Sequence, residues 1–414
     1  MQLLRFFTAG NVDDGKSTLI GRLLYDSDSI STDIIETLTR QSKTTGVNAE
    51  IDLALLTDGL RAEREQGITI DVAYKYFSTT KRKFIIADTP GHIQYTRNMF
   101  TGASNADLAI ILVDARNGIT DQTKRHSIIS ALLGIPHIVV CINKMDLVNY
   151  SQEAYQKIEE DYKAFSKQLH LKEVSFIPAS ALEGDNVVKT SQHMDWYKGP
   201  ALLEFLETVS ITELEKEKAS RFQVQYVIRP QTEALPDYRG FAGHVISGTY
   251  KKGQRVMVLP SGIETVIDRI EVHQQEVELA EANTPVVLHL KEDIDVSRGN
   301  SIIPVEQLPE TGKELTATIC WMDNAAFIPG QKILFQQQSF RTKAIIKEVL
   351  GKIDIHSFTD QQSDGSIKLN DICKVVIKTA EPLSFDSYSQ NRSSGSFILI
   401  HENTNNTIAA GTIN

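Results

Sequence analysis

An eight-residue run near the N-terminus has the residue types and spacing that bind phosphate. The run is Gly10-Asn-Val-Asp-Asp-Gly-Lys-Ser17, which fits GxxxxGK followed by Ser or Thr. Glycines let backbone N–H groups point inward around phosphates, and a following helix N-terminus adds partial positive charge. Lys16 is placed to reach the β- and γ-phosphates, and the Ser17 hydroxyl to bind Mg²⁺. A chance match in a chain this long is on the order of one per cent, so the run predicts nucleotide binding rather than a plain turn.

Two further groups could complete a magnesium and phosphate site. Asp88-Thr-Pro-Gly91 ends an apolar run, where a carboxylate can hold Mg²⁺ through water and the Gly91 N–H can reach the γ-phosphate. Alone this tetrapeptide is only a turn, but after a phosphate-binding loop it predicts function. Thr69 lies between the two motifs and is placed as a second hydroxyl ligand of Mg²⁺. The segment around Thr69 is also strand-like, and both interpretations can hold.

Two more motifs predict the choice of base. Asn143-Lys-Met-Asp146 follows an apolar strand, and the Asp146 carboxylate can accept two hydrogen bonds from the N1–H and N2 amine of guanine. Adenine has no such edge, and a carboxylate left unpaired can reject a ligand by ~10⁴-fold. Ser180-Ala-Leu182 would complete the base pocket, although alone it is as consistent with a plain loop.

The cofactors expected from these motifs are GTP and Mg²⁺. The expected nucleotide contacts are Gly10, Asn11, Val12, Asp13, Asp14, Gly15, Lys16, Ser17, Thr18, Asp88, Gly91, Asn143, Lys144, Asp146, Ser180, Ala181 and Leu182. The expected Mg²⁺ ligands are Ser17, Thr69 and Asp88.

The segments that must position these residues alternate between short apolar runs and amphipathic stretches. Apolar runs such as 84–87, 108–113 and 137–142 predict strands covered on both faces, as in a mostly parallel sheet with helices on both sides. The pattern changes after a charged linker near 213–218. Short alternating strands with Gly and Pro turns then predict β-barrel structure.

We therefore expect an α/β P-loop GTPase domain at 1–212, followed by β-barrel domains at 219–307 and 308–414. A near match to the phosphate-binding pattern, Gly248-Thr-Tyr-Lys-Lys-Gly-Gln254, lacks the lysine. Because it joins two predicted strands, we expect a hairpin turn there.

Bulk composition excludes several classes of protein. The chain has 414 residues and a formal net charge of −10, which argues against non-specific nucleic-acid binding. Its three cysteines are widely spaced and form no CxxC pair, which favours a reducing cytoplasm over a disulfide framework. No apolar run approaches the ~18 residues that span a bilayer. The first residues lack a signal-peptide pattern and predict a buried first strand.

Taken together, the motifs make the chain resemble translation-factor-type GTPases, the group that includes elongation factor Tu. Within that group it most closely resembles the GTPase subunit of bacterial sulfate adenylyltransferase, and the resemblance covers the whole chain. One departure is Ile93, where that family usually has Glu, so the electrostatics of this segment can differ. The strings that carry the resemblance are Asp13-Asp14, 63–74, 84–92, 94–99, 121–126, Asn391-Arg392, 395–400 and 405–411.

The resemblance implies roles that the residues alone do not. His92 would orient the water that attacks the γ-phosphate, with Lys16 and Thr69 as the other catalytic residues, and Val12 and Ile68 would form an apolar gate. GTP hydrolysis would drive formation of adenosine 5′-phosphosulfate and pyrophosphate from ATP and sulfate. A small ATP-binding catalytic subunit would be the partner, because this chain has no second GxxxxGK run. The end at Asn414 suggests that no fused kinase follows.

Two other functions remain open from the sequence. A tRNA-delivering elongation factor would share every GTPase motif, but such factors place an acidic residue at the Gln94 position, and elongation factor Tu has histidine in place of Asp14. A GTP-dependent binding module without turnover is hard to reconcile with Lys16, Thr69 and His92 together.

Overall fold

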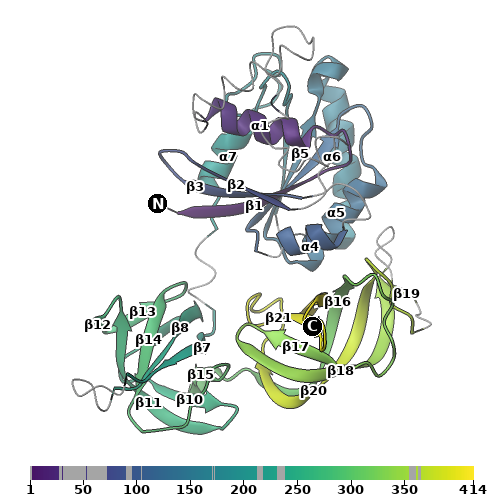
Figure 1. Ribbon diagram of the computed structural model, residues 1–414. Coiled ribbons are helices and arrows are strands. Elements are labelled where there is room, and N and C mark those ends of the chain that lie inside the picture. The colour runs from purple at the N-terminus through teal and green to yellow at the C-terminus, as the bar shows by residue number, and fades with distance from the viewer. Residues whose placement is uncertain are drawn as a thin grey trace. The chain divides into compact units, whose positions relative to one another are not determined.

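The chain folds into two compact units, which Figure 1 shows in sequence colours. In the described part, residues up to Ser210 form one unit and those from Ile211 onward form the other. The structure, a computed structural model, describes residues 2–27, 30, 53, 72–89, 96–103, 105–169, 171, 173–211, 218–230, 238–353, 360–361 and 365–414.

The first unit is built on one twisted sheet with the strand order β2-β3-β1-β4-β5-β6. Four of its five pairings are parallel, and only the edge pair β2–β3 is antiparallel. Every residue of β4 is buried, as expected for a strand covered on both faces. The strands are β1 (Leu3–Ala9), β2 (Ala73–Ser78), β3 (Lys83–Asp88), β4 (Leu108–Asp114), β5 (His137–Asn143) and β6 (Glu173–Pro178).

Helices cover this sheet on both sides, with α1 and α7 together on one face and α4 and α5 on the other (Figure 1). The predicted mostly parallel sheet and its helical layers are confirmed. No helix among the described residues is long and apolar enough to cross a membrane. The helices are α1 (Lys16–Asp26), α4 (Thr96–Ala103), α5 (Asp121–Leu132), α6 (Gln152–Ser166) and α7 (Leu202–Thr208), with short 3-10 turns η3 (Met145–Val148) and η4 (Lys167–Leu169).

The second unit contains two six-stranded β-barrels. In the first, the order β10-β15-β7-β8-β14-β11 closes when β11 pairs again with β10. In the second, the order β17-β21-β22-β16-β20-β18 closes when β18 pairs with β17. Closure removes the exposed strand edges that would otherwise invite aggregation. This confirms the predicted fold class of a GTPase domain followed by two barrels.

The strands of the first barrel region are β7 (Arg221–Ile228), β8 (Gly240–Ser247), β9 (Thr249–Lys251), β10 (Arg255–Leu259), β11 (Ile263–Val272), β12 (Gln275–Val277), β13 (Leu279–Glu281), β14 (Pro285–Leu290) and β15 (Ser301–Pro304). After the 3-10 turn η5 (Val305–Gln307), those of the second are β16 (Glu310–Trp321), β17 (Ile333–Gln337), β18 (Phe340–Ile353), β19 (Asp360–Gln361), β20 (Ile372–Phe385), β21 (Ser396–His401) and β22 (Thr407–Ile413).

Two local features of the first barrel differ from the sequence pattern. Strict alternation along β7 would bury Tyr226 with Phe222 and Val224, but a register shift between Val224 and Tyr226 leaves the tyrosine 68% exposed. The predicted hairpin at 248–254 is wrong. The segment holds the short strand β9, which pairs with β13 rather than with β10.

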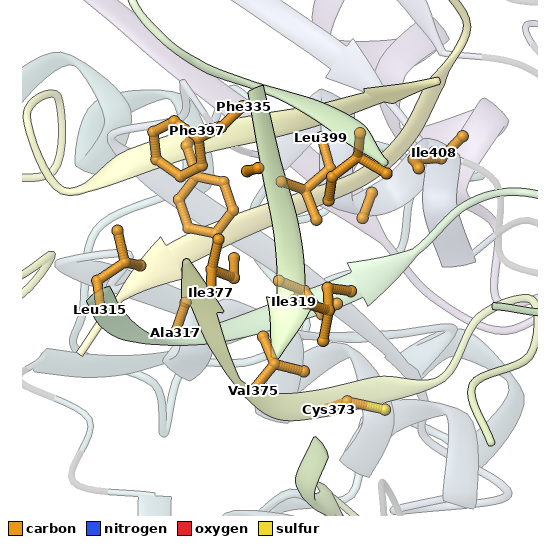
Figure 2. Packing of buried hydrophobic residues seen from close by; sticks show 14 of the residues in the cluster. Leu315, Ala317, Ile319, Phe335, Cys373, Val375, Ile377, Phe397, Leu399 and Ile408 are labelled. Carbon is orange, nitrogen blue, oxygen red and sulfur yellow. The ribbon is translucent and has the colours of Figure 1, made fainter. Parts of the chain in front are cut away.

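The second barrel is filled by side chains at alternate positions of its strands (Figure 2). Leu315, Ala317 and Ile319 of β16 all point into this core. Phe335 of β17 stacks on Phe397 of β21, with ring centroids 4.6 Å apart. The same period-two pattern that predicted strands therefore supplies the hydrophobic interior.

The two barrels are joined by a buried ion pair. Arg221 in β7 donates to both carboxylate oxygens of Asp386, just after β20, at 2.8 and 2.7 Å. Asn391 also donates to the Ser247 hydroxyl at 2.7 Å. A paired, bidentate arginine is stable in such a place, whereas an unpaired buried charge is costly.

We predict that Arg221→Ala destabilises the second unit by about 3–5 kcal/mol, because Asp386 then stays buried without its partner. Denaturant unfolding of the full chain measures this loss. The double variant Arg221→Met/Asp386→Leu removes both charges and should lose less. Lys252→Ala, which breaks an exposed pair with Glu276, should leave the unfolding midpoint nearly unchanged. Equal losses in Arg221→Ala and Lys252→Ala would contradict the assignment.

Candidate nucleotide-binding site

The predicted phosphate-binding loop lies between the buried strand β1 and helix α1. Gly15 has φ +89°, which favours glycine, and a Cβ there would lie 2.4 Å from Asn143 Nδ2. Both the turn and the close approach of Asn143 therefore require glycine. Gly10 is also confined, since its Cβ would lie 3.0 Å from Leu112 Cβ.

The first turn of α1 is open to an anion. Its N-cap is Gly15, no side chain caps the first N–H groups, and no acidic residue stands in the first turn. Lys16, Ser17 and Thr18 begin this helix. Uncapped N–H groups and the helix dipole together favour a phosphate at this position.

Strand pairing brings Lys16 to Asp88. Parallel pairing of β1 with β3 places Thr8 opposite Asp88, and the Thr8 hydroxyl donates to Asp88 Oδ1 at 3.3 Å. Lys16 Nζ lies 3.6 Å from the same oxygen and donates to the Thr89 carbonyl oxygen. Only 8% of Lys16 is exposed, so its ammonium is held within the phosphate-binding site.

The chemistry of this donor set fits Mg²⁺. Asp88 contributes a buried carboxylate at a strand end and Ser17 a hydroxyl at the start of α1. Both are oxygen donors, which this hard cation prefers. The described residues contain no cluster of His, Cys, Asp and Glu that could hold a metal alone. Such a cluster is not needed, because Mg²⁺ in nucleotide sites takes its remaining ligands from phosphates and water.

The Asn143 side chain joins the phosphate loop to the predicted base pocket. Its Nδ2 donates to the Asp14 carbonyl oxygen at 2.7 Å, and its Oδ1 accepts from the Ala181 N–H at 2.9 Å. Asn143 is buried at the end of β5, so both hydrogen bonds are sheltered from water. Two motifs predicted separately are thus held at fixed distance by one amide.

Asp146 is held beside the loop that follows β6. Ser180 Oγ donates to Asp146 Oδ1 at 2.6 Å. Arg22, on α1, donates to the carbonyl oxygens of Ala181 and of Leu182, whose side chain is exposed. Sequence reasoning missed Arg22, which carries no motif and acts only because α1 packs beside this loop.

The sequence analysis also missed Asp114 and Arg116. Burial alone would raise the pKa of the Asp114 carboxyl, but hydrogen bonds from Arg116 and Lys144 outweigh that and lower it to about 2. Lys144 also donates to the Asp13 carbonyl oxygen and thereby reaches the phosphate loop. The available signal was an aspartate at the carboxyl end of β4, where the ends of parallel strands meet.

His126 of α5 lies close enough to Lys16 of the phosphate loop to interact with it electrostatically. Burial, with Lys16 and Arg125 nearby, lowers the pKa of His126 to about 3, so the imidazole is neutral at physiological pH. Its Nδ1 is buried without a hydrogen-bond partner in the part of the chain that the structure describes. A neutral ring adds no third positive charge beside Lys16 and Arg125.

Several predicted residues lie outside the described ranges. Thr69, Gly91 and His92 are among them, as are Ile68 and Ile93, and their roles stay predictions. Within the described ranges, the structure brings together the phosphate loop, Asp88, Asn143-Lys144, Asp146 and the Ser180–Leu182 loop.

Comparison with known families defines the class of this chain. The family model for the elongation factor Tu GTP binding domain matches residues 1–214, about half of the chain. A second model, the GTP-eEF1A C-terminal domain-like family, matches residues 314–414. Together with the site described above, these matches define a GTP-binding GTPase of the elongation factor Tu class.

Similarity over the whole length narrows the assignment. A sulfate adenylyltransferase subunit 1 from Colwellia psychrerythraea is 49% identical over 414 residues, covering 100% of this chain and 88% of the relative. Proteins of the same name from Erwinia tasmaniensis and Salmonella typhi are each 50% identical over 99% of this chain and cover 86% and 85% of the relative. The chain belongs to the sulfate adenylyltransferase subunit 1 family.

We predict that Asp146→Asn weakens GTP binding at least ~10²-fold and favours xanthosine triphosphate, because the amide can donate to the extra oxygen of xanthine. Titration with both nucleotides measures the change. Leu147→Ala, at an exposed neighbouring position, should leave both affinities unchanged. Unchanged GTP affinity in Asp146→Asn would overturn the base-pocket assignment.

Proposed function

We propose that this chain hydrolyses GTP to drive the synthesis of adenosine 5′-phosphosulfate and pyrophosphate from ATP and sulfate, with the chemistry on ATP carried out by a second subunit. The observation that carries the proposal is that Asn143 joins the phosphate loop to the predicted base pocket, in a chain about 50% identical over its length to relatives named sulfate adenylyltransferase subunit 1. Their name implies a second subunit, for which a small ATP-binding protein fits best.

Different residues of this chain have different roles in binding and hydrolysing GTP. Lys16 and the N-terminus of α1 bind the phosphates, and Asp146 selects guanine. Ser17, Thr69 and Asp88 would hold Mg²⁺, which when bound neutralises charge on the phosphates. His92 would orient the attacking water.

Coupling to GTP hydrolysis has a thermodynamic reason in this reaction. Adenylyl transfer from ATP to sulfate is uphill, so coupling it to GTP hydrolysis would move the yield beyond the equilibrium of the uncoupled reaction. Such coupling requires a segment that contacts the partner differently in the GTP and GDP states. Thr69, as the Mg²⁺ ligand expected to respond to the γ-phosphate, is the residue best suited to that role. We also propose a cytoplasmic location, which suits three free, buried cysteines.

We predict that His92→Ala lowers GTP turnover by ~10²–10⁴-fold with little change in nucleotide affinity, because contact with the attacking water is made in the transition state. Lys16→Ala should instead weaken binding by roughly 10- to 100-fold, because its partners are ground-state phosphates. Nucleotide titration and single-turnover hydrolysis separate the two effects. The control is Lys157→Ala, at an exposed position of α6, which should change neither affinity nor turnover. Equal losses of affinity in both site variants would show that the two roles are misassigned.

We predict that the purified chain alone makes no adenosine 5′-phosphosulfate, and that with its small subunit the yield rises with GTP but not with GDP. Thr69→Ala should lose this increase in yield even where it still binds GTP. The segment around Thr69 could then no longer respond to the γ-phosphate and change its contacts with the partner. The measurement is product formed per GTP hydrolysed.

The same preparation discriminates the alternative function. Partners recovered from sulfur-starved cells should include a small ATP-binding subunit. Equal yields with GTP and GDP, or recovery of aminoacyl-tRNA instead, would overturn the sulfate assignment and favour an elongation factor.

A further inference from the structure

The side chain of Asp14 closes the phosphate-binding loop from within. Its Oδ2 accepts from the Asn11 N–H at 2.6 Å, while its own N–H donates to the Asn11 carbonyl oxygen at 3.2 Å. Its carbonyl oxygen accepts from Asn143 Nδ2 at 2.7 Å. The Asp14 backbone therefore connects the phosphate-binding loop to Asn143 and, through Asn143, to the predicted base pocket.

This carboxyl is buried, and no basic side chain among the described residues forms an ion pair with it. Only 4% of Asp14 is exposed, and it makes no ion pair within the described ranges. The two nearby lysines are engaged elsewhere, since Lys16 lies against Asp88 and Lys144 lies 3.0 Å from Asp114 Oδ2. An isolated buried carboxylate is costly and tends to become neutral instead.

The charges that face Asp14 come from three elements. Asp13 in the loop and Asp114 at the end of β4 disfavour its ionised form, whereas Lys144 after β5 and the Asn11 N–H favour it. Burial is the largest influence, and the balance raises the pKa of Asp14 to about 6. Asp114, paired with Lys144 and Arg116, stays ionised at physiological pH and continues to repel a charge on Asp14.

We propose that Asp14 is a positioning residue of the phosphate-binding loop and takes up one proton from solvent when nucleotide phosphates bind. Bound phosphates add negative charge beside a carboxyl that already titrates close to neutral pH, so the neutral form becomes favoured. A neutral carboxyl still accepts from the Asn11 N–H through its carbonyl oxygen, and the loop keeps its shape. The inference requires only that the chain binds guanine nucleotide, so it stands or falls independently of coupling to a partner.

The direction of the pH dependence of nucleotide affinity follows from the protonation of Asp14 with and without bound nucleotide. Without nucleotide, Asp14 is mostly ionised above pH 6, and with nucleotide it stays protonated to a higher pH. Nucleotide affinity should therefore fall as pH rises through this window, by up to about tenfold per pH unit. The phosphates also titrate near neutral pH, and a matched variant is needed to subtract their contribution.

Asp14→Asn supplies that match, because the amide is the same size, keeps an oxygen acceptor and cannot ionise. Titration calorimetry with GDP, run at pH 7 in two buffers of different ionisation enthalpy, counts the protons exchanged on binding. The wild type should take up about half a proton or more beyond Asp14→Asn. Asp13→Asn removes an equal charge from an exposed neighbour but leaves Asp14 able to ionise, so it should still take up more protons than Asp14→Asn, whatever its affinity.

The positioning role needs a second comparison. Asp14→Ala removes the acceptor as well as the charge, so it should bind GDP about five- to tenfold more weakly than Asp14→Asn at every pH from 6 to 8. Asp14→Asn should bind more tightly than the wild type at pH 8 and about equally near pH 6. A wild type that exchanges no more protons than Asp14→Asn would overturn the proton uptake, and an Asp14→Ala as tight as Asp14→Asn would overturn the positioning role. If Asp14→Asn does not fold, Asp14→Ala, which also cannot ionise at this position, replaces it as the reference for the proton count.

Discussion

The nucleotide site depends on one primary amide, that of Asn143. Its donor binds the carbonyl oxygen of Asp14 and its acceptor binds the N–H of Ala181, so a single planar group spans the phosphate loop and the base loop. A carboxylate of the same shape would lack the donor, and a shorter side chain would lack the reach. Gly15 must be glycine because this amide passes so close to it. The predicted phosphate loop and the predicted base pocket are thereby held in one rigid arrangement.

Charge in the site is arranged as interleaved pairs rather than as one positive pocket. Lys16 lies against Asp88, and Lys144 lies between Asp114 and the Asp13 carbonyl oxygen. Pairing holds the lysine side chains in place in a partly desolvated region, where isolated charges would be costly. The buried carboxyl of Asp14 has no ion pair among the described residues. This environment is the reason for the proposal that Asp14 takes up a proton when phosphates bind.

The barrels follow a different physical rule. Their interiors are filled by alternate residues of each strand, and their closure satisfies backbone groups that an open sheet would expose. The buried Arg221–Asp386 pair then ties one barrel to the other. Because the pair is bidentate and sheltered, it resists separation more than an exposed pair would.

The sequence by itself determined the class of fold, the order of the domains and the motifs of the site. Apolar runs and alternation report burial on two faces or one, and glycine-rich motifs report backbone conformation, so both are local properties. Only the tertiary structure decided what Asn143 joins, because its partners lie 129 and 38 residues away. The tertiary structure also decided that Arg22 donates to the loop at Ala181 and Leu182, and that Asp114 pairs with Arg116 and Lys144. It likewise decided that the Asp14 carboxyl is buried. The bulge that turns Tyr226 outward was also decided there, since register depends on the neighbouring strand.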